Sequence, residues 1–344
     1  MKPLRPPADL RRMVYNHSSP DRPEERARNS AMGTVENDKP VLVIGAAGLD
    51  MVGRLSGDPE EGSSTPARIR VAYGGVARNV AENLARLSQP CALLSAVGDD
   101  APGRGLISVL KEAGVDVSAV RVLAGQSTGA YLAVVDSRGR LRTALDDMTS
   151  LQAVTPDELI RQEPLFRSAC MIFLDANLSP ETIREAIRLA QKHNIPVSAD
   201  PTSRHLAARL TPHLKDLHLV TPNAGEAEVL LGRKISQEDP SSASQAAREL
   251  VMRGVCIAII SLAEFGVAYA TREERGHFPA LRTTIVDPTG AGDALTAAVL
   301  FAALNDIPLD EAVRLGISAA TLTLRSRLAV VPDLSLERLY EEIR

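Results

Sequence analysis

Short apolar runs alternate with helical patterns along the chain from residue 41 onward. Six runs have the length of a strand and are apolar on both faces: residues 41–47, 91–98, 170–176, 196–201, 217–223 and 256–262. Strands with this pattern are covered by helices on both sides of a sheet. Between the runs, apolar residues recur with helical spacing over residues 76–87, 103–114, 180–194 and 241–254. The alternation predicts an α/β fold with a doubly wound, mostly parallel sheet, whose ligands bind beyond the carboxyl ends of the strands.

Two stretches interrupt this alternation with a period of two residues. They cover residues 51–75 and 129–147, and the second contains a Ser-Arg-Gly turn at 137–139. Such stretches are typical of antiparallel hairpins, and these are too few and too polar to form a core of their own. We therefore predict a small β-sheet lid over the ligand edge of the main domain, with strands from about 51–75 and 120–147. The alternative is a hairpin that decorates one side of the domain.

The start of the chain has neither period. Residues 1–39 are rich in Pro, Arg and Glu and lack the apolar surface that would offset the entropy of ordering them. We expect a disordered N-terminal extension over 1–39 and one domain over 40–344. Asp9, Asp21, Glu24 and Glu25 argue against a transit peptide, and Met32 offers an alternative internal start.

The amino-acid composition limits the kinds of binding partner to be expected. The 344 residues are 44% hydrophobic and 24% charged, as in an ordinary globular protein. A net charge of −4 gives no reason to expect nucleic acid or an anionic membrane, and no apolar run approaches the ~20 residues of a membrane span. Aromatic residues make up only 3%, which argues against a stacking platform for single-stranded nucleic acid. We expect a small-molecule ligand.

The cysteines point to a compartment rather than to a metal. Cys91, Cys170 and Cys256 lie far apart and form no CxxC pair, so a zinc site is not favoured. Three unpaired thiols suit a reducing compartment, and we predict a cytoplasmic location.

A glycine-lined turn stands before a long alanine-rich helical run in IVDPTGAGDALTAAVLFAAL, residues 285–304. Helix N-termini attract anions, and Gly290 and Gly292 let an anion approach the backbone closely. Asp293 would compete with a bound phosphate unless the two act together, with the backbone holding a phosphoryl group in transfer and Asp293 accepting the proton of the attacking hydroxyl. The alternative is an ordinary capping carboxylate. No GxxxxGK[ST] motif occurs, which excludes a P-loop.

Three motifs resemble the ribokinase-like, or pfkB, family of sugar and nucleoside kinases. They are DPTGAGDA at residues 287–294, GGVARNVAENLARLS at 74–88 and TPNAGEAEVL at 221–230. The resemblance implies a ribokinase-like fold, ATP-dependent phosphorylation of a nucleoside or sugar, and Mg²⁺ as cofactor. Further stretches resemble the pseudouridine kinases of that family, which implies transfer to the 5′-hydroxyl of pseudouridine; they cover residues 93–100, 127–148 and 330–335.

Other functions stay open at this point. The chain would also suit another kinase of the family, of the ribokinase or the adenosine or inosine type, or a non-catalytic member that binds a nucleoside or sugar. A complete anion hole with Asp293 argues against the non-catalytic reading. A nicotinamide-dependent dehydrogenase fits poorly, because GAAGLD after the first strand lacks the GxGxxG spacing.

The resemblance assigns roles around the transferred group. Asp293 is implied to be the catalytic base, and the N–H groups of Gly290, Ala291 and Gly292 to stabilise the developing charge. Because an alcohol is too weak an acid to lose its proton beforehand, we expect Asp293 to accept it late, as the phosphorus–oxygen bond forms.

The resemblance also implies a substrate site. Asp50 would accept hydrogen bonds from two ribose hydroxyls, with a turn-capping role as its alternative. Gly74 and Gly75 would let the backbone approach the sugar, and Asn79 would hydrogen-bond to it. The remaining candidates are Asp175 or Asn177, which follow residues 170–174, and Thr128, Tyr131 and Asp147 on the lid side for the base; Tyr131 also suits a packing role.

The cofactor residues follow in the same way. Asn223 and Glu226 are implied to organise Mg²⁺ through water, although their spacing also suits a capping box. Ser261 and Gly266 match a turn near the ATP phosphates, where Ala263 replaces a glycine. The last two implications are a K⁺ site at Asp287 and the carbonyl of Thr289, and a homodimer formed through the lid strands.

Overall fold

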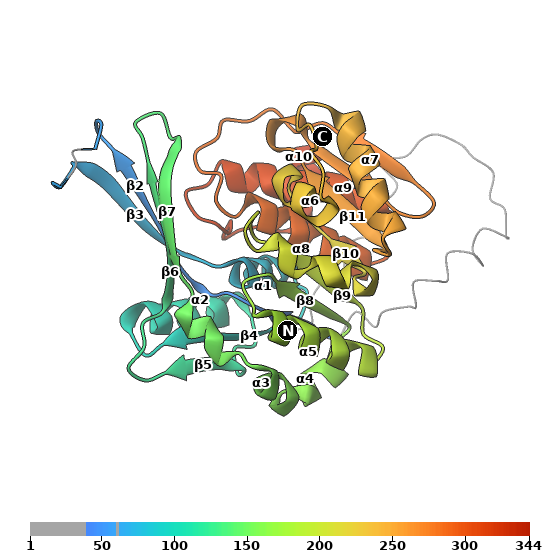
Figure 1. Cartoon of the computed structure of the whole chain (residues 1–344), viewed down its shortest axis with the longest axis horizontal. Coiled ribbons are helices and arrows are strands. Elements are labelled where there is room, and N and C mark those ends of the chain that lie inside the picture. Colours follow the sequence, from blue (N-terminus) through green and yellow to red (C-terminus); the bar gives the residue numbers. More distant parts are fainter. Residues whose placement is uncertain (1–38, 60–61) are drawn as a thin grey trace. The chain divides into compact units, whose positions relative to one another are not determined.

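A nine-stranded sheet lies at the centre of the protein in the computed structural model, which describes residues 39–59 and 62–344 (Figure 1). The predicted N-terminal extension lies outside the described residues, apart from Lys39. In spatial order the strands are β13 (Arg275–Phe278), β12 (Val267–Ala270), β11 (Ile257–Ser261), β10 (Leu219–Val220), β9 (Val197–Asp200), β8 (Met171–Asp175), β1 (Val41–Ile44), β4 (Cys91–Gly98) and β5 (Val120–Leu123).

The six strands predicted from apolar runs are confirmed, and they pair in parallel. β1 lies between β4 and β8, and every residue of these three strands is buried, as the apolar residues on both faces predict. The pattern missed β12 and β13, which extend the sheet as an antiparallel pair beside β11. Each has only four residues, too few to show a period.

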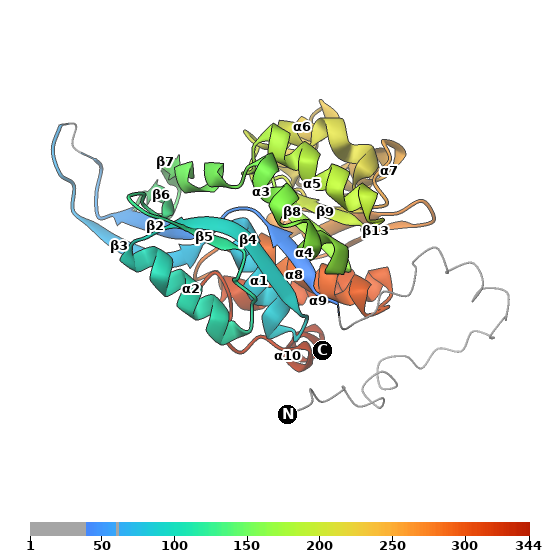
Figure 2. The ribbon, with the colours of Figure 1, turned by 90° about the horizontal axis from the view of Figure 1, so that it is seen from below.

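Helices cover both faces of this sheet, which confirms the doubly wound prediction (Figure 2). One layer holds α1 (Val76–Arg86), α2 (Ala101–Ala113), α8 (Ala291–Leu304), α9 (Leu309–Leu324) and α10 (Leu336–Ile343). The other holds α3 (Pro156–Arg161), α4 (Glu163–Ser168), α5 (Pro180–Lys192), α6 (Ala224–Leu231) and α7 (Pro240–Met252). Among the residues that the structure describes, no helix is both long and apolar enough to cross a membrane.

A second, four-stranded sheet projects from the main sheet as the predicted lid (Figure 1). Its strands, in the order β3, β2, β6 and β7, cover Ala67–Gly74, Gly48–Leu55, Gly129–Val135 and Leu141–Asp147. Both antiparallel hairpins are confirmed, and a parallel pairing of β2 with β6 joins them.

One boundary of the predicted lid is wrong. Residues 120–123 form β5, which pairs in parallel with Ser95–Gly98 of β4 at the edge of the main sheet. The sequence VRVL alternates like a lid strand because an edge strand also has one exposed side. The lid sheet itself therefore begins its second hairpin at Gly129.

Candidate active site

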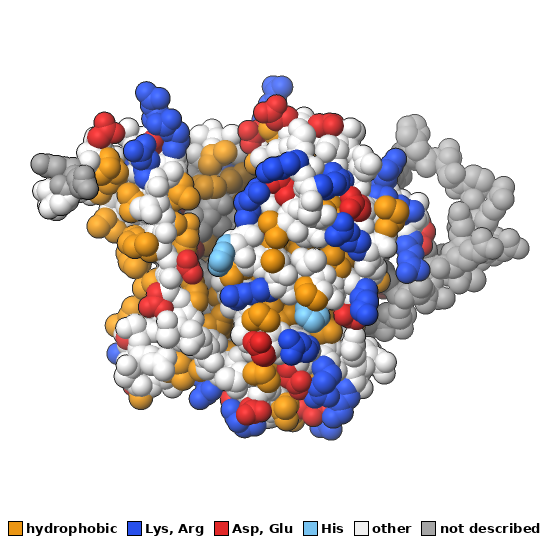
Figure 3. All heavy atoms as spheres, in the orientation of Figure 1, with side chains coloured by type: hydrophobic (Ala, Val, Ile, Leu, Met, Phe, Trp, Pro, Cys, Tyr) orange, Lys and Arg blue, Asp and Glu red, His pale blue; other side chains and the backbone are white. Residues whose placement is uncertain are grey.

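A cavity of about 1020 Å³ lies between the inner face of the lid and the main domain, and Figure 3 shows this hollow from outside. The main domain contributes residues that follow β1, β8 and β9, so the cavity lies beyond the carboxyl ends of the strands, as predicted. The predicted site residues that line it are Asp50, Gly75, Asn79, Tyr131, Asn177, Asp287, Thr289 and Asp293.

The turn before α8 has the geometry of an anion-binding helix start. Gly290 is the N-cap with φ +80°, and a Cβ there would overlap the carbonyl oxygen of Ala329. A Cβ on Gly292 would instead meet no atom within 4 Å, so this position faces open space. Among the described residues no side chain caps the first turn of α8. The N–H of Ala291 makes a long hydrogen bond of 3.4 Å to the carbonyl oxygen of Pro288. Among the described residues nothing accepts from the N–H groups of Gly290 and Gly292, which are left for a ligand.

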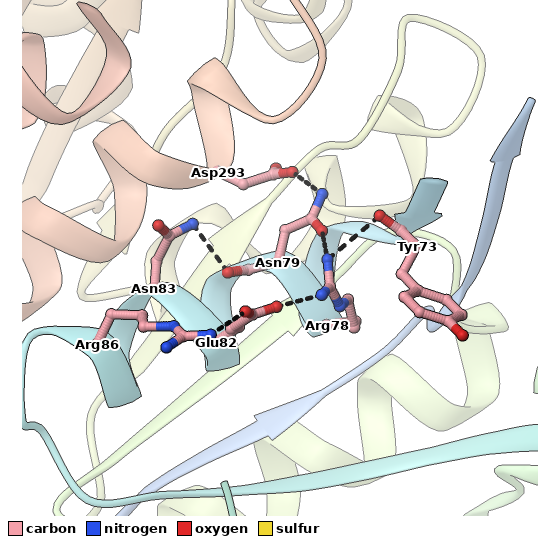
Figure 4. A network of polar contacts seen from close by, with 7 residues as sticks. All are labelled: Tyr73, Arg78, Asn79, Glu82, Asn83, Arg86 and Asp293. Atoms are coloured by element: carbon pink, nitrogen blue, oxygen red, sulfur yellow. Dashed lines mark hydrogen bonds and ion pairs between the residues drawn. The ribbon is translucent and has the colours of Figure 1, made fainter. Parts of the chain in front are cut away.

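Asp293 lies in that first turn and lines the cavity. The Nδ2 amino group of Asn79 donates to its Oδ2 atom at 2.7 Å (Figure 4). Burial raises the pKa of Asp293 to about 7, against the lowering effect of the Asn79 hydrogen bond. A carboxyl group with a pKa near neutrality suits general acid–base chemistry at physiological pH.

Asp50 faces the same cavity from the lid strand β2. Burial raises its pKa to about 6, while the nearby Arg78 and Arg70 lower it. The pair Gly74 and Gly75 makes room for this arrangement. A Cβ on Gly74 would overlap the Asp50 carboxylate, and a Cβ on Gly75, where φ is +95°, would overlap the backbone of Ala46.

Of the two candidates at the end of β8, Asn177 lines the cavity and Asp175 is fully buried. Asp175 accepts hydrogen bonds from the backbone N–H groups of Ala46, Ala77 and Asn177 at 2.8, 3.0 and 2.9 Å. It thereby ties the end of β1 to the start of α1. Its carboxylate has a structural role, because its oxygens are satisfied within the protein.

Two of the three lid candidates lie away from the cavity, and only Tyr131 lines it. The Thr128 hydroxyl is bonded to the Asp100 carboxylate and also accepts from the backbone of Gly98. Asp147 caps the next turn by accepting from Thr149 at 3.0 Å. Asp146, which the sequence reasoning missed, lines the cavity instead, because neighbouring residues of a strand point to opposite faces.

Asn223 and Glu226 form the capping box at the start of α6. Glu226 Oε2 accepts from the backbone of Asn223 at 2.9 Å, and Asn223 Oδ1 accepts from the backbone of Glu226 at 3.0 Å. Neither lines the cavity, yet Glu226 has a buried acidic neighbour in Asp200, at the end of β9. Burial raises the pKa of both carboxyl groups, and the charge of Glu226 raises that of Asp200 further. Two buried carboxylates short of positive charge fit a hydrated Mg²⁺ ion.

The predicted ATP turn follows β11. The backbone N–H of Ser261 donates to the carbonyl of Pro222, next to Asn223, at 3.0 Å. Gly266 has φ +100°, and a Cβ there would overlap the carbonyl of Phe278. Ala263 adopts φ +50°, a left-handed conformation that glycine adopts more easily.

The predicted K⁺ site is occupied by a side chain from the lid. Arg70 of β3 forms an ion pair with Asp287, and the other carboxylate oxygen accepts from the backbone of Thr289 at 2.8 Å. Because a positive charge already pairs with this carboxylate, the residues present do not fit a K⁺ ion at Asp287. The sequence reasoning missed Arg70, because nothing in its neighbourhood shows that β3 faces the turn before α8.

Comparison with known proteins places this geometry among kinases. The model of the pfkB family of carbohydrate kinases matches residues 38–334. The chain is 31% identical to the pseudouridine kinase of Escherichia coli over 297 residues, which cover 86% of this chain and 94% of that protein. It is 28% identical to the guanosine-inosine kinase of Exiguobacterium acetylicum, with 86% and 97% covered. The structure of Arabidopsis thaliana ribokinase complexed with ribose and ATP superposes with a TM-score of 0.76 at 22% identity, covering 89% of this chain and 99% of the ribokinase.

Proposed function

The chain belongs to the pfkB family of carbohydrate kinases, and from this premise we propose that it transfers the terminal phosphoryl group of ATP to the 5′-hydroxyl of pseudouridine. The observation that supports the reaction most directly is Asp293 with a pKa of about 7, in the first turn of a helix that no described side chain caps. The identity to a pseudouridine kinase supports the choice of acceptor.

In the proposed reaction, Asp293 accepts the proton of the 5′-hydroxyl as the new phosphorus–oxygen bond forms. The backbone N–H groups of Gly290, Ala291 and Gly292 donate to the oxygens of the phosphoryl group in transfer. Donors of this kind contribute about 2.7–4 kcal/mol each to transition-state stabilisation. In this proposal, Ser261 and Gly266 contact the ATP phosphates.

Asp50 binds the sugar in this proposal. Its carboxylate lines the same cavity as Asp293 and is close enough to raise the pKa of Asp293. A carboxylate is suited to accept from the 2′- and 3′-hydroxyls together. Asn79 and Asn177 offer amide groups on the main-domain side. Glu226 and Asn223, with Asp200 beside them, would hold Mg²⁺ through water, and the ion would offset phosphate charge when bound.

Recognition of the base falls to the inner face of the lid. Pseudouridine carries a free N1–H, so a selective site needs an acceptor there. Asp146 supplies a carboxylate and Tyr131 a hydroxyl on the cavity side. Thr128 and Asp147, the other two lid candidates, are oriented by their hydrogen bonds away from this role.

The lid also supports a homodimer as part of this proposal. Strand pairing aligns Val71, Met51, Leu132 and Leu145 in one row across its four strands, on the face opposite to Asp50 and Tyr131. Val71 is 54% exposed and Leu145 is 62% exposed. An apolar row of this length suits a second copy of the same lid. Light scattering of the parent and of Leu145→Asp tests it, and a monomeric parent at assay concentration would contradict it.

A panel of acceptors tests the proposed function. We expect ADP release with pseudouridine at a kcat/KM at least about tenfold above uridine, inosine, guanosine, ribose and fructose, because only pseudouridine presents a pyrimidine N1–H to the lid acceptor. Asp293→Asn serves as the background control. A preference for guanosine or inosine, or for a free sugar, would assign the chain to another activity of the family.

We also propose a cytoplasmic location, because the three cysteines are unpaired and unpaired thiols suit a reducing compartment.

A further inference from the structure

Arg78 is a charged side chain buried under the floor of the cavity, with only 4% of its surface exposed. It forms an ion pair with Glu82, one turn later on α1, and donates to the carbonyl oxygen of Tyr73 at 3.2 Å. Its Nη1 atom also donates to Oδ1 of Asn79 at 2.8 Å (Figure 4). The guanidinium therefore lies directly behind the amide that contacts Asp293.

The contact with Arg78 decides which way the Asn79 amide faces. An asparagine side chain has one accepting and one donating end, whereas a guanidinium only donates. The oxygen of Asn79 must then face Arg78, and the amino group faces Asp293, where it donates to Oδ2 at 2.7 Å. A flipped amide would set its amino group against the guanidinium and its oxygen against the carboxylate.

We propose that Arg78 is a positioning residue for phosphoryl transfer, which locks the Asn79 amide so that one oxygen of Asp293 is held and the other is presented to the acceptor hydroxyl. The inference rests on the proposed function, because it takes Asp293 as the base. Glu82 anchors the guanidinium, and the Asn83 side chain holds the carbonyl of Asn79 at 2.9 Å.

Arg78 has a second effect on Asp293, because its positive charge acts on the pKa of that carboxyl group. The groups that act on Asp293 and on its acidic neighbours are Asp50 of β2, Asp175 of β8, Asp200 of β9, Glu226 of α6, Arg70 of β3 and Arg78 of α1. Carboxylates dominate this set, and Arg78 lowers the pKa of both Asp293 and Asp50. Loss of its charge would make the ionised base less stable and move its pKa upward.

Arg86 provides a matched control on the same helix. It pairs with the other oxygen of Glu82 at 3.0 Å, and its described contacts include neither Asn79 nor Asp293 (Figure 4). Arg78→Lys keeps the charge, but one ammonium group cannot reproduce the planar fork that serves Asn79, Glu82 and Tyr73 together. Arg86→Lys makes the same chemical change beside the same carboxylate.

We expect Arg78→Lys to lower kcat about 10- to 100-fold with little change in the KM of the acceptor, and Arg86→Lys to stay within about twofold of the parent. Arg78→Met should also move the acid limb of the kcat profile to higher pH, so that its deficit is greater at pH 6 than at pH 9. A purely structural role would lower the folded fraction and leave that profile in place. If Arg78→Met fails to fold, the double variant Arg78→Met with Glu82→Met removes both buried charges, so that neither is left unpaired. We expect the same shift of its kcat profile to higher pH.

Parent kcat and an unchanged pH profile in the folded Arg78 variants would overturn the inference. Failure of the proposed function is recognised separately, by a parent enzyme that phosphorylates none of the acceptors. In that case the carboxyl ¹³C resonance of Asp293, assigned with Asp293→Asn, reports its pKa directly. A higher pKa in Arg78→Met than in the parent supports the electrostatic contact, and equal values overturn it.

Discussion

Helices α6 and α8 both begin beside the candidate site, and they satisfy their first turns in opposite ways. At α6, Asn223 and Glu226 close a reciprocal capping box, so the helix uses its own side chains. At α8 the N-cap is Gly290, and no described side chain accepts from the first turn. The comparison shows that a helix start can be built either for the stability of the chain or for a ligand, and that the residues at the cap decide which.

The largest effect expected from this contrast is the loss of the proposed base, Asp293, at the start of α8. Asp293→Asn keeps the size of the side chain but cannot accept a proton, so we expect kcat to fall about 10²- to 10⁴-fold with the fold unchanged. Steady-state ADP release and far-ultraviolet circular dichroism check the two halves of the prediction. Turnover within a few-fold of the parent would remove Asp293 from the role of base.

The pH dependence of the parent sharpens the same prediction. With a pKa of about 7, Asp293 is protonated in acid, so kcat/KM should fall roughly tenfold per pH unit below about pH 6. Because the pKa of Asp293 is raised in the folded state, the protonated carboxyl group favours the folded state in acid, and this contribution to the unfolding free energy is lost as the pH rises through 7. Asp293→Asn should therefore melt higher than the parent at pH 8, and this advantage should shrink toward pH 4. An equal difference in melting temperature between Asp293→Asn and the parent at pH 8 and at pH 4 would contradict the raised pKa of Asp293.

Two glycines of the α8 turn should separate catalysis from stability. Gly292→Ala places a methyl group in open space at the helix start, where it obstructs the transferred group; we expect kcat to fall about tenfold or more while the melting temperature stays near that of the parent. Gly290→Ala combines φ +80° with an overlap of the Ala329 carbonyl and should cost about 1–3 kcal/mol of unfolding free energy. Denaturant unfolding and kinetics on both variants check the contrast. Equal stability losses would contradict it.

The smallest effect is expected at the capped helix. Asn223→Ala removes the acceptor for the backbone of Glu226 and should lower the unfolding free energy by about 0.5–2 kcal/mol. Asn223→Ser keeps a capping oxygen and should recover most of that loss. The two variants also test the proposed role in magnesium binding. A higher Mg²⁺ requirement in both variants supports that role, whereas a higher requirement in the alanine variant alone shows an effect of the lost cap.

Local sequence patterns predicted most of the main fold. The six central strands and the four helices between them follow from apolar spacing, since a strand buried on both faces leaves a continuous apolar run. The pattern failed at β5, β12 and β13, because strands of four residues are too short to show which sheet they join. Sheet membership is set by partners far along the chain, and periodicity contains no information about them.

The candidate site divides in the same way. Asp293 and the glycine turn could be predicted from the sequence, because the glycines, the acid and the helix that follows them lie within one short segment. Asp175 and Asn177 could not be separated, since both lie at the end of the same strand and only the hydrogen bonds from Ala46 and Ala77 to Asp175 show which is buried. Asp147 was preferred to Asp146, although one residue along a strand reverses the face.

By itself, the sequence determined the alternation of strands and helices, the glycine-lined start of α8 and the acid beside it, because each depends on residues within a few positions of one another. The tertiary structure decided that Arg70 of the lid meets Asp287, that Asn79 meets Asp293, and that Arg78 orients the amide between them. The contacts of Arg70 and Asn79 join residues more than 200 positions apart. Distances of that kind are fixed by how sheets and helices pack, which local spacing cannot specify.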